Sequence, residues 1–253
     1  MVRILLSGAL GKMGRTVAAC VEEDENCSIV AGLDRFEDIA GSFPVYSSAD
    51  KITEAADVII DFSHPSALPA VLDYAVSKKI PAVIATTGLS QFDMDKVSEA
   101  SKIVPIFRSA NMSLGINLLL NLVSKAAAVL QNGFDIEVIE KHHNQKLDAP
   151  SGTALMITDA ISKSLDYAPH YMYDRHSRRA KREKTEIGIH SIRAGNITGE
   201  HEVLFASAEE MIEIKHTAVS KGVFASGAIN AAKFLVGKQS GIYSMTDLVN
   251  EMK

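Results

Sequence analysis

The stretch of residues 140–154 carries side chains that could transfer protons at neutral pH. It reads Glu-Lys-His-His-Asn-Gln-Lys-Leu-Asp-Ala-Pro-Ser-Gly-Thr-Ala. A histidine or lysine held close to a reacting atom can donate a proton to that atom. His142, His143 and Lys146 are therefore candidates for proton transfer and substrate binding.

The end of the same stretch has the composition of a helix start that could bind an anion. Ser151 is a suitable N-cap, because its hydroxyl can accept a hydrogen bond from an amide of the first helical turn. The amides of Gly152 and Thr153 would then lie at the positive end of the helix, where a carboxylate can bind. The stretch thus predicts titratable donors beside a carboxylate site.

Three interpretations of the two histidines compete: metal binding, a solvated polar loop, and acid catalysis beside a carboxylate site. Metal binding by His142 and His143 is disfavoured, because adjacent residues of an extended chain point in opposite directions and no cysteine or HExxH-type partner is near. A solvated loop would suit Asn144 and Gln145, but it does not explain a helix start stripped of bulky side chains. We favour acid catalysis with carboxylate binding and expect no metal.

A glycine turn near the N-terminus indicates a nucleotide site. Residues 4–14 read Ile-Leu-Leu-Ser-Gly-Ala-Leu-Gly-Lys-Met-Gly, with an apolar run before the glycines and a helical pattern after them. Such glycines let the backbone turn sharply and approach a pyrophosphate at the helix N-terminus. Leu10 replaces the second glycine of the usual G-x-G-x-x-G, so a turn used only for packing is the alternative.

An acidic residue at the expected distance supports the nucleotide interpretation. Asp34 lies 20 residues after Gly14, at the end of the next apolar run, where an acid can bind the ribose hydroxyls of the adenosine. Asp34 favours the 2′-hydroxyl of NAD, whereas the neighbouring Arg35 and Lys12 of the turn favour the 2′-phosphate of NADP. We therefore predict that both NADH and NADPH are used.

Strands and helices alternate through the first hundred residues. Apolar runs predict strands at Val2–Ser7, Ser28–Leu33, Asp57–Phe62, Ala82–Ala85 and Ile103–Phe107, and periodic patterns predict helices at Gly11–Glu23, Pro65–Ser77 and Gln91–Ser101. This alternation is typical of a parallel sheet covered on both faces. Loops Ala85–Gly88 and Ser109–Met112 follow the fourth and fifth strands, at the ends where open α/β sheets bind ligands.

The second half has an α+β pattern. Helices are predicted at Ser113–Gln131 and Gly152–Leu165, and strands at Asp135–Glu140, Glu186–Arg193, His201–Ser207 and Met211–Thr217. A last helix at about Val223–Val236 is rich in small residues and is expected to pack on the first domain. The predicted fold is α/β: a Rossmann-type doubly wound parallel sheet (residues 1–112 and 223–253) with a second α+β substrate and oligomerisation domain (residues 113–222) inserted before the C-terminal helix.

Composition limits the possible partners. The 253 residues include 26 Lys and Arg against 31 Asp and Glu, so no overall positive field exists to hold nucleic acid. Two cysteines, Cys20 and Cys27, fit a reducing compartment and core packing. No secretory signal and no apolar run near 18 residues are present, so we expect a cytoplasmic protein without membrane contact. The basic run of residues 175–184 could bind nucleic acid or an acidic partner, but we interpret it as a solvated loop.

The stretch 140–154 resembles the characteristic motif of the 4-hydroxy-tetrahydrodipicolinate reductase family, formerly called dihydrodipicolinate reductase. The resemblance covers nearly the whole chain. Its other matching segments are Gly8–Gly14, Ala85–Gly88, Asn111–Asn117, Arg193–His201 and Phe224–Ala228.

The resemblance implies an activity and its site residues. The implied reaction is NAD(P)H-dependent reduction of 4-hydroxy-tetrahydrodipicolinate to tetrahydrodipicolinate in lysine and diaminopimelate biosynthesis, with hydride added at substrate C4. It implies proton transfer by His142 and Lys146, substrate binding by His143, and a carboxylate site at Gly152 and Thr153. It also implies a homotetramer that acts on a small dicarboxylate.

The same resemblance implies which residues contact the cofactor. They are Gly8, Ala9, Leu10, Gly11, Lys12 and Met13 at the pyrophosphate, Asp34 and Arg35 at the adenosine ribose, and Ala85, Thr86, Thr87, Ser109, Ala110, Asn111 and Met112 near the nicotinamide. Two rival functions are a different nicotinamide oxidoreductase and a redox-sensing regulator whose basic run touches DNA. Both would keep the glycine turn, but neither explains residues 140–154.

Overall fold

The computed structural model describes residues 1–40 and 42–251, which form two compact units. Unit 1 comprises Met1–Leu114 and the chain from Lys221 onward, and unit 2 comprises Gly115–Ser220. From sequence, the borders were predicted after residues 112 and 222. The assignment of the cofactor to unit 1 and the substrate to unit 2 stays a prediction.

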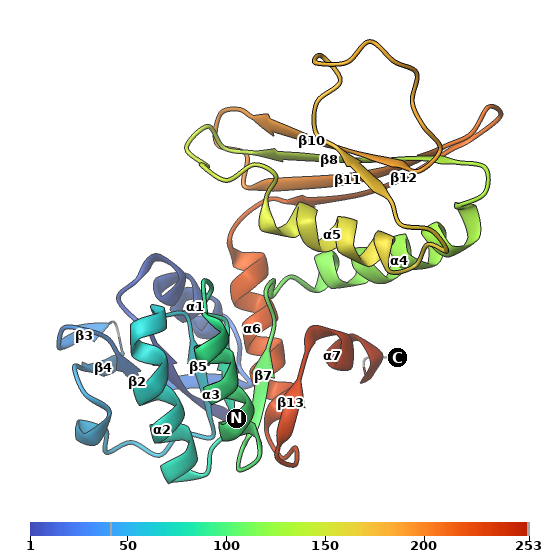
Figure 1. Ribbon diagram of the computed structural model, residues 1–253. Coiled ribbons are helices and arrows are strands. Elements are labelled where there is room, and N and C mark those ends of the chain that lie inside the picture. The colour runs from blue at the N-terminus through green and yellow to red at the C-terminus, as the bar shows by residue number, and fades with distance from the viewer. Residues whose placement is uncertain (41, 252–253) are drawn as a thin grey trace. The chain divides into compact units, whose positions relative to one another are not determined.

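Unit 1 is built on an eight-stranded sheet with the order β13-β7-β6-β5-β1-β2-β4-β3 (Figure 1). All neighbouring strands are parallel except β3 and β4. The strands are β1 (Val2–Ser7), β2 (Cys27–Leu33), β3 (Asp38–Ala40), β4 (Phe43–Tyr46), β5 (Val58–Asp61), β6 (Ala82–Ile84), β7 (Pro105–Arg108) and β13 (Gly241–Tyr243). Because β1 lies between β2 and β5, the strand order reverses there, and open α/β sheets bind ligands at the carboxyl ends beside such a reversal.

Side chains of β1 alternate between two apolar layers of unit 1. Ile4 and Leu6 pack in one layer with residues of α1 (Lys12–Glu22) and α6 (Gly222–Leu235). Leu5 packs in the other with residues of α2 (Leu68–Lys78) and α3 (Gln91–Ser101). A strand buried on both faces must be apolar throughout, which explains why this run reads as a continuous hydrophobic segment. The predicted doubly wound sheet is confirmed.

The C-terminal part of unit 1 corrects one prediction. Helix α6 packs on unit 1 as expected, but it is not the last element. β13 adds to the sheet beside β7, and α7 (Met245–Glu251) buries Met245 and Leu248. Strands of three or four residues and a seven-residue helix are too short to show a clear periodic pattern, and β3 and β4 were missed for the same reason. Two 3₁₀ turns, Ala49–Lys51 and Pro65–Ala67, complete the unit.

Unit 2 contains a mixed five-stranded sheet with the order β12-β11-β8-β10-β9. Helices α4 (Leu114–Leu130) and α5 (Gly152–Ser162) lie along one face of it (Figure 1). The strands are β8 (Asp135–His142), β9 (His170–Met172), β10 (Glu186–Arg193), β11 (Gly199–Ala206) and β12 (Met211–Ala218). Val138 and Val203 pack against Ile157 of α5. Because side chains alternate along β8, Glu140 and His142 share the helix-covered face with Val138.

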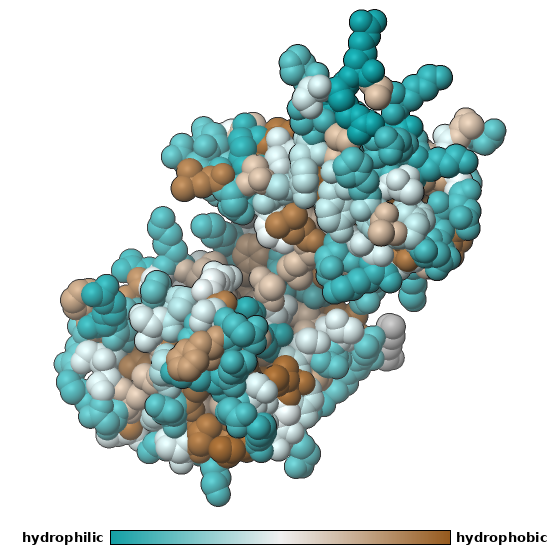
Figure 2. Space-filling view, in the orientation of Figure 1, coloured by the Kyte–Doolittle hydropathy of each residue, from teal (hydrophilic) through white to brown (hydrophobic). Residues whose placement is uncertain are grey.

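The loop between β9 and β10 contains the basic run and forms a hydrophilic projection above the sheet (Figure 2). The run was interpreted as a solvated loop, and the structure corrects this in part. Arg182 donates to Glu137 and Asp135 and to the carbonyls of Ile136, Glu183 and Glu186. Within the described chain, no helix is long and apolar enough to cross a membrane.

Candidate active site

The glycine turn of unit 1 is fixed by close backbone contacts. Gly8 has a φ of 76°, and a Cβ added there would lie 2.7 Å from the carbonyl oxygen of Phe62. A Cβ at Gly14 would lie 2.1 Å from the carbonyl oxygen of Gly8. Side chains are therefore excluded at both positions, because backbone atoms cannot move aside as a flexible side chain can.

The N-terminus of α1 fits the phosphates of a dinucleotide. The cap residue is Gly11, which has no side chain to bond the first amides, and the first turn contains no acidic residue among the described positions. The amides at a helix N-terminus carry partial positive charge and bind anions. The cradle left by the glycines and these amides together suit a pyrophosphate.

Asp34 is held directly against this turn. Its Oδ2 accepts a hydrogen bond from the amide of Leu10 at 2.9 Å, and its Oδ1 accepts one from the amide of Arg35 at 2.7 Å. Leu10 acts through its backbone amide, and its φ is not positive, so the backbone does not require a glycine at this position. Arg35 and Lys12 are exposed. The structure therefore brings Asp34 to the turn, and its predicted contact with the ribose hydroxyls stays a prediction.

The loop after β6 is anchored by a buried acid that sequence reasoning missed. Asp61, at the end of β5, is completely buried, and its Oδ2 accepts a hydrogen bond from the hydroxyl of Thr86 at 2.6 Å. Its Oδ1 accepts one from the amide of Ser63 at 3.2 Å. Ala85 is buried and Thr87 is exposed. An acid at the end of the apolar strand Asp57–Phe62 was the signal that could have identified this residue.

The loop after β7 turns through hydrogen bonds of its own side chains. The Ser109 hydroxyl donates to the carbonyl of Asn111 at 2.7 Å, and Asn111 Oδ1 accepts from the amide of Ser113 at 2.9 Å. Ala110 is exposed, whereas the side chain of Met112 is buried in the core of unit 1. Because β6 and β7 are neighbouring strands, the two predicted nicotinamide loops lie at one edge of the sheet.

In unit 2, His142 belongs to a buried charged network. Its Nδ1 lies 2.5 Å from Oε2 of Glu140, which is completely buried. Arg193 donates to the same carboxylate from Nη1 at 2.8 Å and from Nη2 at 2.7 Å. The amide of Ser151 donates to Glu140 Oε1 at 3.2 Å. This carboxylate therefore connects the candidate proton-transfer group to the start of α5.

The electrostatics of the network favour an ionised acid beside a neutral imidazole. Burial alone would raise the pKa of Glu140, but hydrogen bonds from Arg193 and His142 lower it to about 2. Burial lowers the pKa of His142 below its ordinary value, against the opposite effect of Glu140. His142 is therefore neutral at pH 7 and can accept a proton.

A second buried histidine adjoins this network. The ring of His201 meets the ring of His142 edge to face, with 5.2 Å between the centroids. His201 Nε2 lies 3.1 Å from the hydroxyl of Ser151. Burial, together with the nearby His142, lowers the pKa of His201 to about 4.

The network residues Glu140, Arg193 and His201 were not identified from sequence as site residues. β-sheet register brings them together, since Arg193 on β10 pairs with His142 and His201 on β11 pairs with Glu140. Two sequence signals were available: Glu140 lies two residues before His142 on the same face of the strand, and Arg193 and His201 begin and end one of the segments that resemble the family.

Of the remaining predicted residues, His143 and Lys146 lie on the loop between β8 and α5, and Gly152 and Thr153 are the first residues of α5. The Lys146 ammonium forms an ion pair with Asp148 at 2.9 Å, and His143 is half-buried. The Ser151 hydroxyl accepts a hydrogen bond from the amide of Ala154 at 3.1 Å, so the predicted N-cap is confirmed. Gly152 is exposed, and a Cβ there would meet no atom within 4 Å. Lys146 and His143 thus stand on the loop that joins His142 to this helix start.

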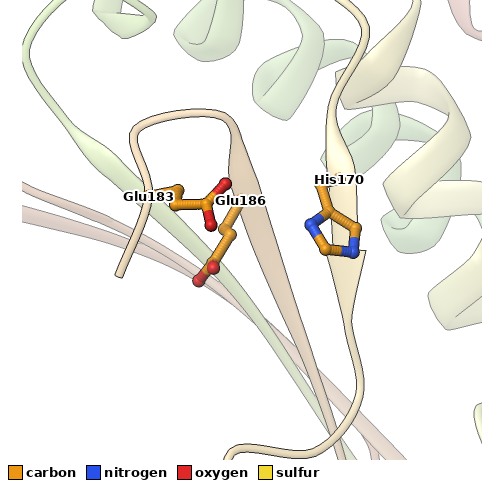
Figure 3. A group of neighbouring side chains, drawn as sticks. All are labelled: His170, Glu183 and Glu186. Carbon is orange, nitrogen blue, oxygen red and sulfur yellow. The ribbon is translucent and has the colours of Figure 1, made fainter. Parts of the chain in front are cut away.

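A possible metal-binding group lies elsewhere in unit 2. Ligand atoms of His170, Glu183 and Glu186 fall within 4.8 Å of one another (Figure 3). Arg175 donates to Glu186 at 2.8 Å, and Arg178 forms ion pairs with both Glu183 and Glu186. Because arginines neutralise these carboxylates, the group acts as an anchor for the basic loop rather than as a cation site.

The doubly wound sheet with a glycine turn at its strand reversal, joined to a second unit with a buried imidazole and acid, defines a Rossmann-type oxidoreductase. The family description "Dihydrodipicolinate reductase, N-terminus" matches residues 2–112, and "Dihydrodipicolinate reductase, C-terminus" matches residues 115–249. The chain belongs to the dihydrodipicolinate reductase family. The resemblance found in the sequence is thereby confirmed.

Individual relatives agree with this membership. The 4-hydroxy-tetrahydrodipicolinate reductase of Caldanaerobacter subterraneus subsp. tengcongensis is 52% identical over 251 residues, covering 99% of both chains. That of Clostridium novyi is 48% identical over 249 residues, covering 98% of both. The dipicolinate-bound dihydrodipicolinate reductase from Paenisporosarcina sp. TG-14 has a TM-score of 0.82 at 24% identity, covering 99% of both chains, and shows the same fold.

Proposed function

We propose that this chain reduces 4-hydroxy-tetrahydrodipicolinate to tetrahydrodipicolinate with NADH or NADPH, as a step of lysine and diaminopimelate biosynthesis. Membership of the dihydrodipicolinate reductase family supports the reaction. One observation carries the proposal. The His142 ring contacts the buried carboxylate of Glu140, and the same carboxylate accepts a hydrogen bond from the Ser151 amide at the start of α5. Proton transfer and carboxylate binding can then act on one small molecule.

The proposed roles follow the position of each group. The substrate loses water, takes a hydride at C4, and takes a proton at C3. A bound nicotinamide cofactor supplies the hydride. Lys146 and His142 move the proton, which accelerates such steps by about 10²–10⁴-fold. His143 binds one substrate carboxylate, and the amides of Gly152 and Thr153 bind the other at the N-terminus of α5.

Use of both nicotinamide cofactors is part of the proposal. Asp34 can bind ribose hydroxyls beside the turn, while the exposed Arg35 and Lys12 can bind a 2′-phosphate. Fluorescence titration with NADH and with NADPH should give dissociation constants within about a hundredfold of each other. A larger difference would contradict dual use.

A cytoplasmic homotetramer completes the proposal. The face of the unit 2 sheet opposite α4 and α5 exposes Ile192 and Met211. Exposed apolar side chains and unpaired sheet edges favour association with further copies. Analytical ultracentrifugation should find four copies of the chain in one particle.

A coupled assay tests the reaction. Dihydrodipicolinate synthase is used to make the substrate, and oxidation of NAD(P)H is followed at 340 nm. Oxidation that depends on the synthase product supports the proposal. Oxidation with other substrates only would indicate a different oxidoreductase, and binding of NADH without turnover would indicate a redox-sensing regulator.

A further inference from the structure

We infer that Glu140 is a positioning residue that fixes both the orientation and the tautomer of His142. The inference rests on the proposed function, because it assigns His142 to proton transfer. The Glu140 side chain is completely buried, and the donors around it include His142 Nδ1, Arg193 Nη1 and Nη2, and the amide of Ser151. Every one of these atoms lies within 3.2 Å of a carboxylate oxygen.

The tautomer follows from the donor count. An ionised carboxylate has only lone pairs to offer, so the histidine nitrogen facing it must carry the hydrogen. His142 Nδ1 is that nitrogen, and the lone pair of the neutral ring therefore lies on Nε2. A Cβ at Gly199 would stand 3.1 Å from Nε2. The glycine leaves space at the atom that must exchange protons with substrate.

The same carboxylate aligns the two halves of the proposed substrate site. Its contact with the Ser151 amide connects it to the N-terminus of α5. Arg193 also donates to the carbonyl of Asp148 at 2.6 Å, on the loop that carries Lys146. Glu140 thus holds the imidazole, the lysine loop and the helix start in one arrangement.

A merely structural role makes different predictions. A buried ion pair can be retained for stability alone, and breaking it would then lower the free energy of unfolding without changing proton transfer. Glu140→Gln separates the two roles, because it keeps the shape but removes the charge. The Gln amide can present either its oxygen or its NH₂ group to Nδ1, so the tautomer of His142 is no longer fixed.

The expected result of Glu140→Gln is a fall in kcat of about 10²-fold, with the Kd for NADH unchanged. The groups facing His142 are Glu140, Arg193, His201 and Lys146, and of these Glu140 and His201 contact the ring. Since Glu140 raises the pKa of His142, its removal shifts the acidic limb of the kcat/KM profile to lower pH. Wild-type kcat and an unshifted limb would overturn the inference.

The same strand offers a matched control. Glu137 Oε2 lies 2.7 Å from His190 Nε2, so it forms a carboxylate–imidazole pair on the opposite face of β8. Glu137→Gln should leave kcat and the pH profile unchanged. If it lowers kcat as much as Glu140→Gln does, the effect is one of sheet stability and the inference fails.

Two further measurements test the inference, and the first uses the wild-type protein and needs no activity. ¹⁵N NMR of the wild-type imidazoles should show the hydrogen of His142 on Nδ1, and a hydrogen on Nε2 would overturn the inference even if the protein proves to catalyse another reaction. In a His142→Asn background, Glu140→Gln should lower kcat much less than the fall of about 10²-fold expected in the wild-type background. An equal fall in both backgrounds would show that Glu140 does not act through His142. An inactive wild type with the expected tautomer would contradict only the proposed function.

Discussion

The two units build their candidate sites in opposite ways. In unit 1 the site is formed by backbone, since Gly8 and Gly14 have no space for a Cβ and the helix N-terminus is left uncapped by side chains. In unit 2 the site is formed by side chains, since the buried carboxylate of Glu140 bonds both His142 and the two terminal nitrogens of Arg193. A substitution that adds a side chain therefore damages the site formed by backbone. A substitution that removes a charge but keeps the shape of the side chain damages the buried charged network.

The largest expected effect separates chemistry from cofactor binding. Lys146→Ala or His142→Ala should lower kcat by about 10²–10⁴-fold, because each removes a proposed proton-transfer group. The Kd for NADH should stay nearly unchanged, since the predicted cofactor residues all belong to unit 1. Steady-state kinetics and fluorescence titration measure the two quantities. Full activity of Lys146→Ala would refute the role of that residue.

The pH dependence of the free energy of unfolding tests how strongly burial lowers the pKa of His201 in unit 2. The pKa of His201 is about 4 in the folded protein, against an ordinary value of 6.5, a difference equivalent to roughly 3 kcal/mol. The unfolded chain takes up the proton first, so the free energy of unfolding falls as the pH drops from about 6.5 to 4, and this loss levels off below pH 4.

Urea unfolding at several pH values measures this dependence. In His201→Gln the titrating group is absent, so the fall between pH 6.5 and 4 should be smaller by that amount. An equal slope in the variant and the wild type would show that another group is responsible.

Two glycines at helix starts compare the units directly. Gly14→Ala places a Cβ 2.1 Å from a backbone oxygen, so the turn must open, at a cost of about 1–3 kcal/mol and with weaker NADH binding. Gly152→Ala meets no atom within 4 Å and should leave the free energy of unfolding unchanged or raise it by up to about 1 kcal/mol. Urea unfolding of both variants tests this, and equal losses would contradict the difference between the units.

The smallest expected effect concerns the basic loop. Arg182→Ala removes hydrogen bonds to Glu137, Asp135 and backbone carbonyls and should lower the free energy of unfolding by about 1–2 kcal/mol. Lys181→Ala changes an exposed neighbour and should stay within about 0.5 kcal/mol of the wild type. Thermal or urea unfolding distinguishes them. Equal stability of the two variants would mean that the loop is not anchored.

Sequence reasoning succeeded where a pattern is local. The helix Gln91–Ser101 was predicted with the observed bounds, and the N-cap Ser151 was recognised from the residues around it. It failed for β13 and α7, which are held by contacts with β7 and the core rather than by their own pattern. It also assigned the basic run to solvent, because the acids that anchor Arg182 lie 45 and 47 residues away.

By itself, the sequence determined the doubly wound fold, the glycine turn with Asp34, and the residues of stretch 140–154 that could act on a substrate. These features depend on periodicity and on spacing within a short segment. Only the tertiary structure revealed that Glu140, Arg193 and His201 surround His142. The register of β8 with β10 and β11 sets those contacts, and it is decided by the packing of the whole sheet rather than by any one strand.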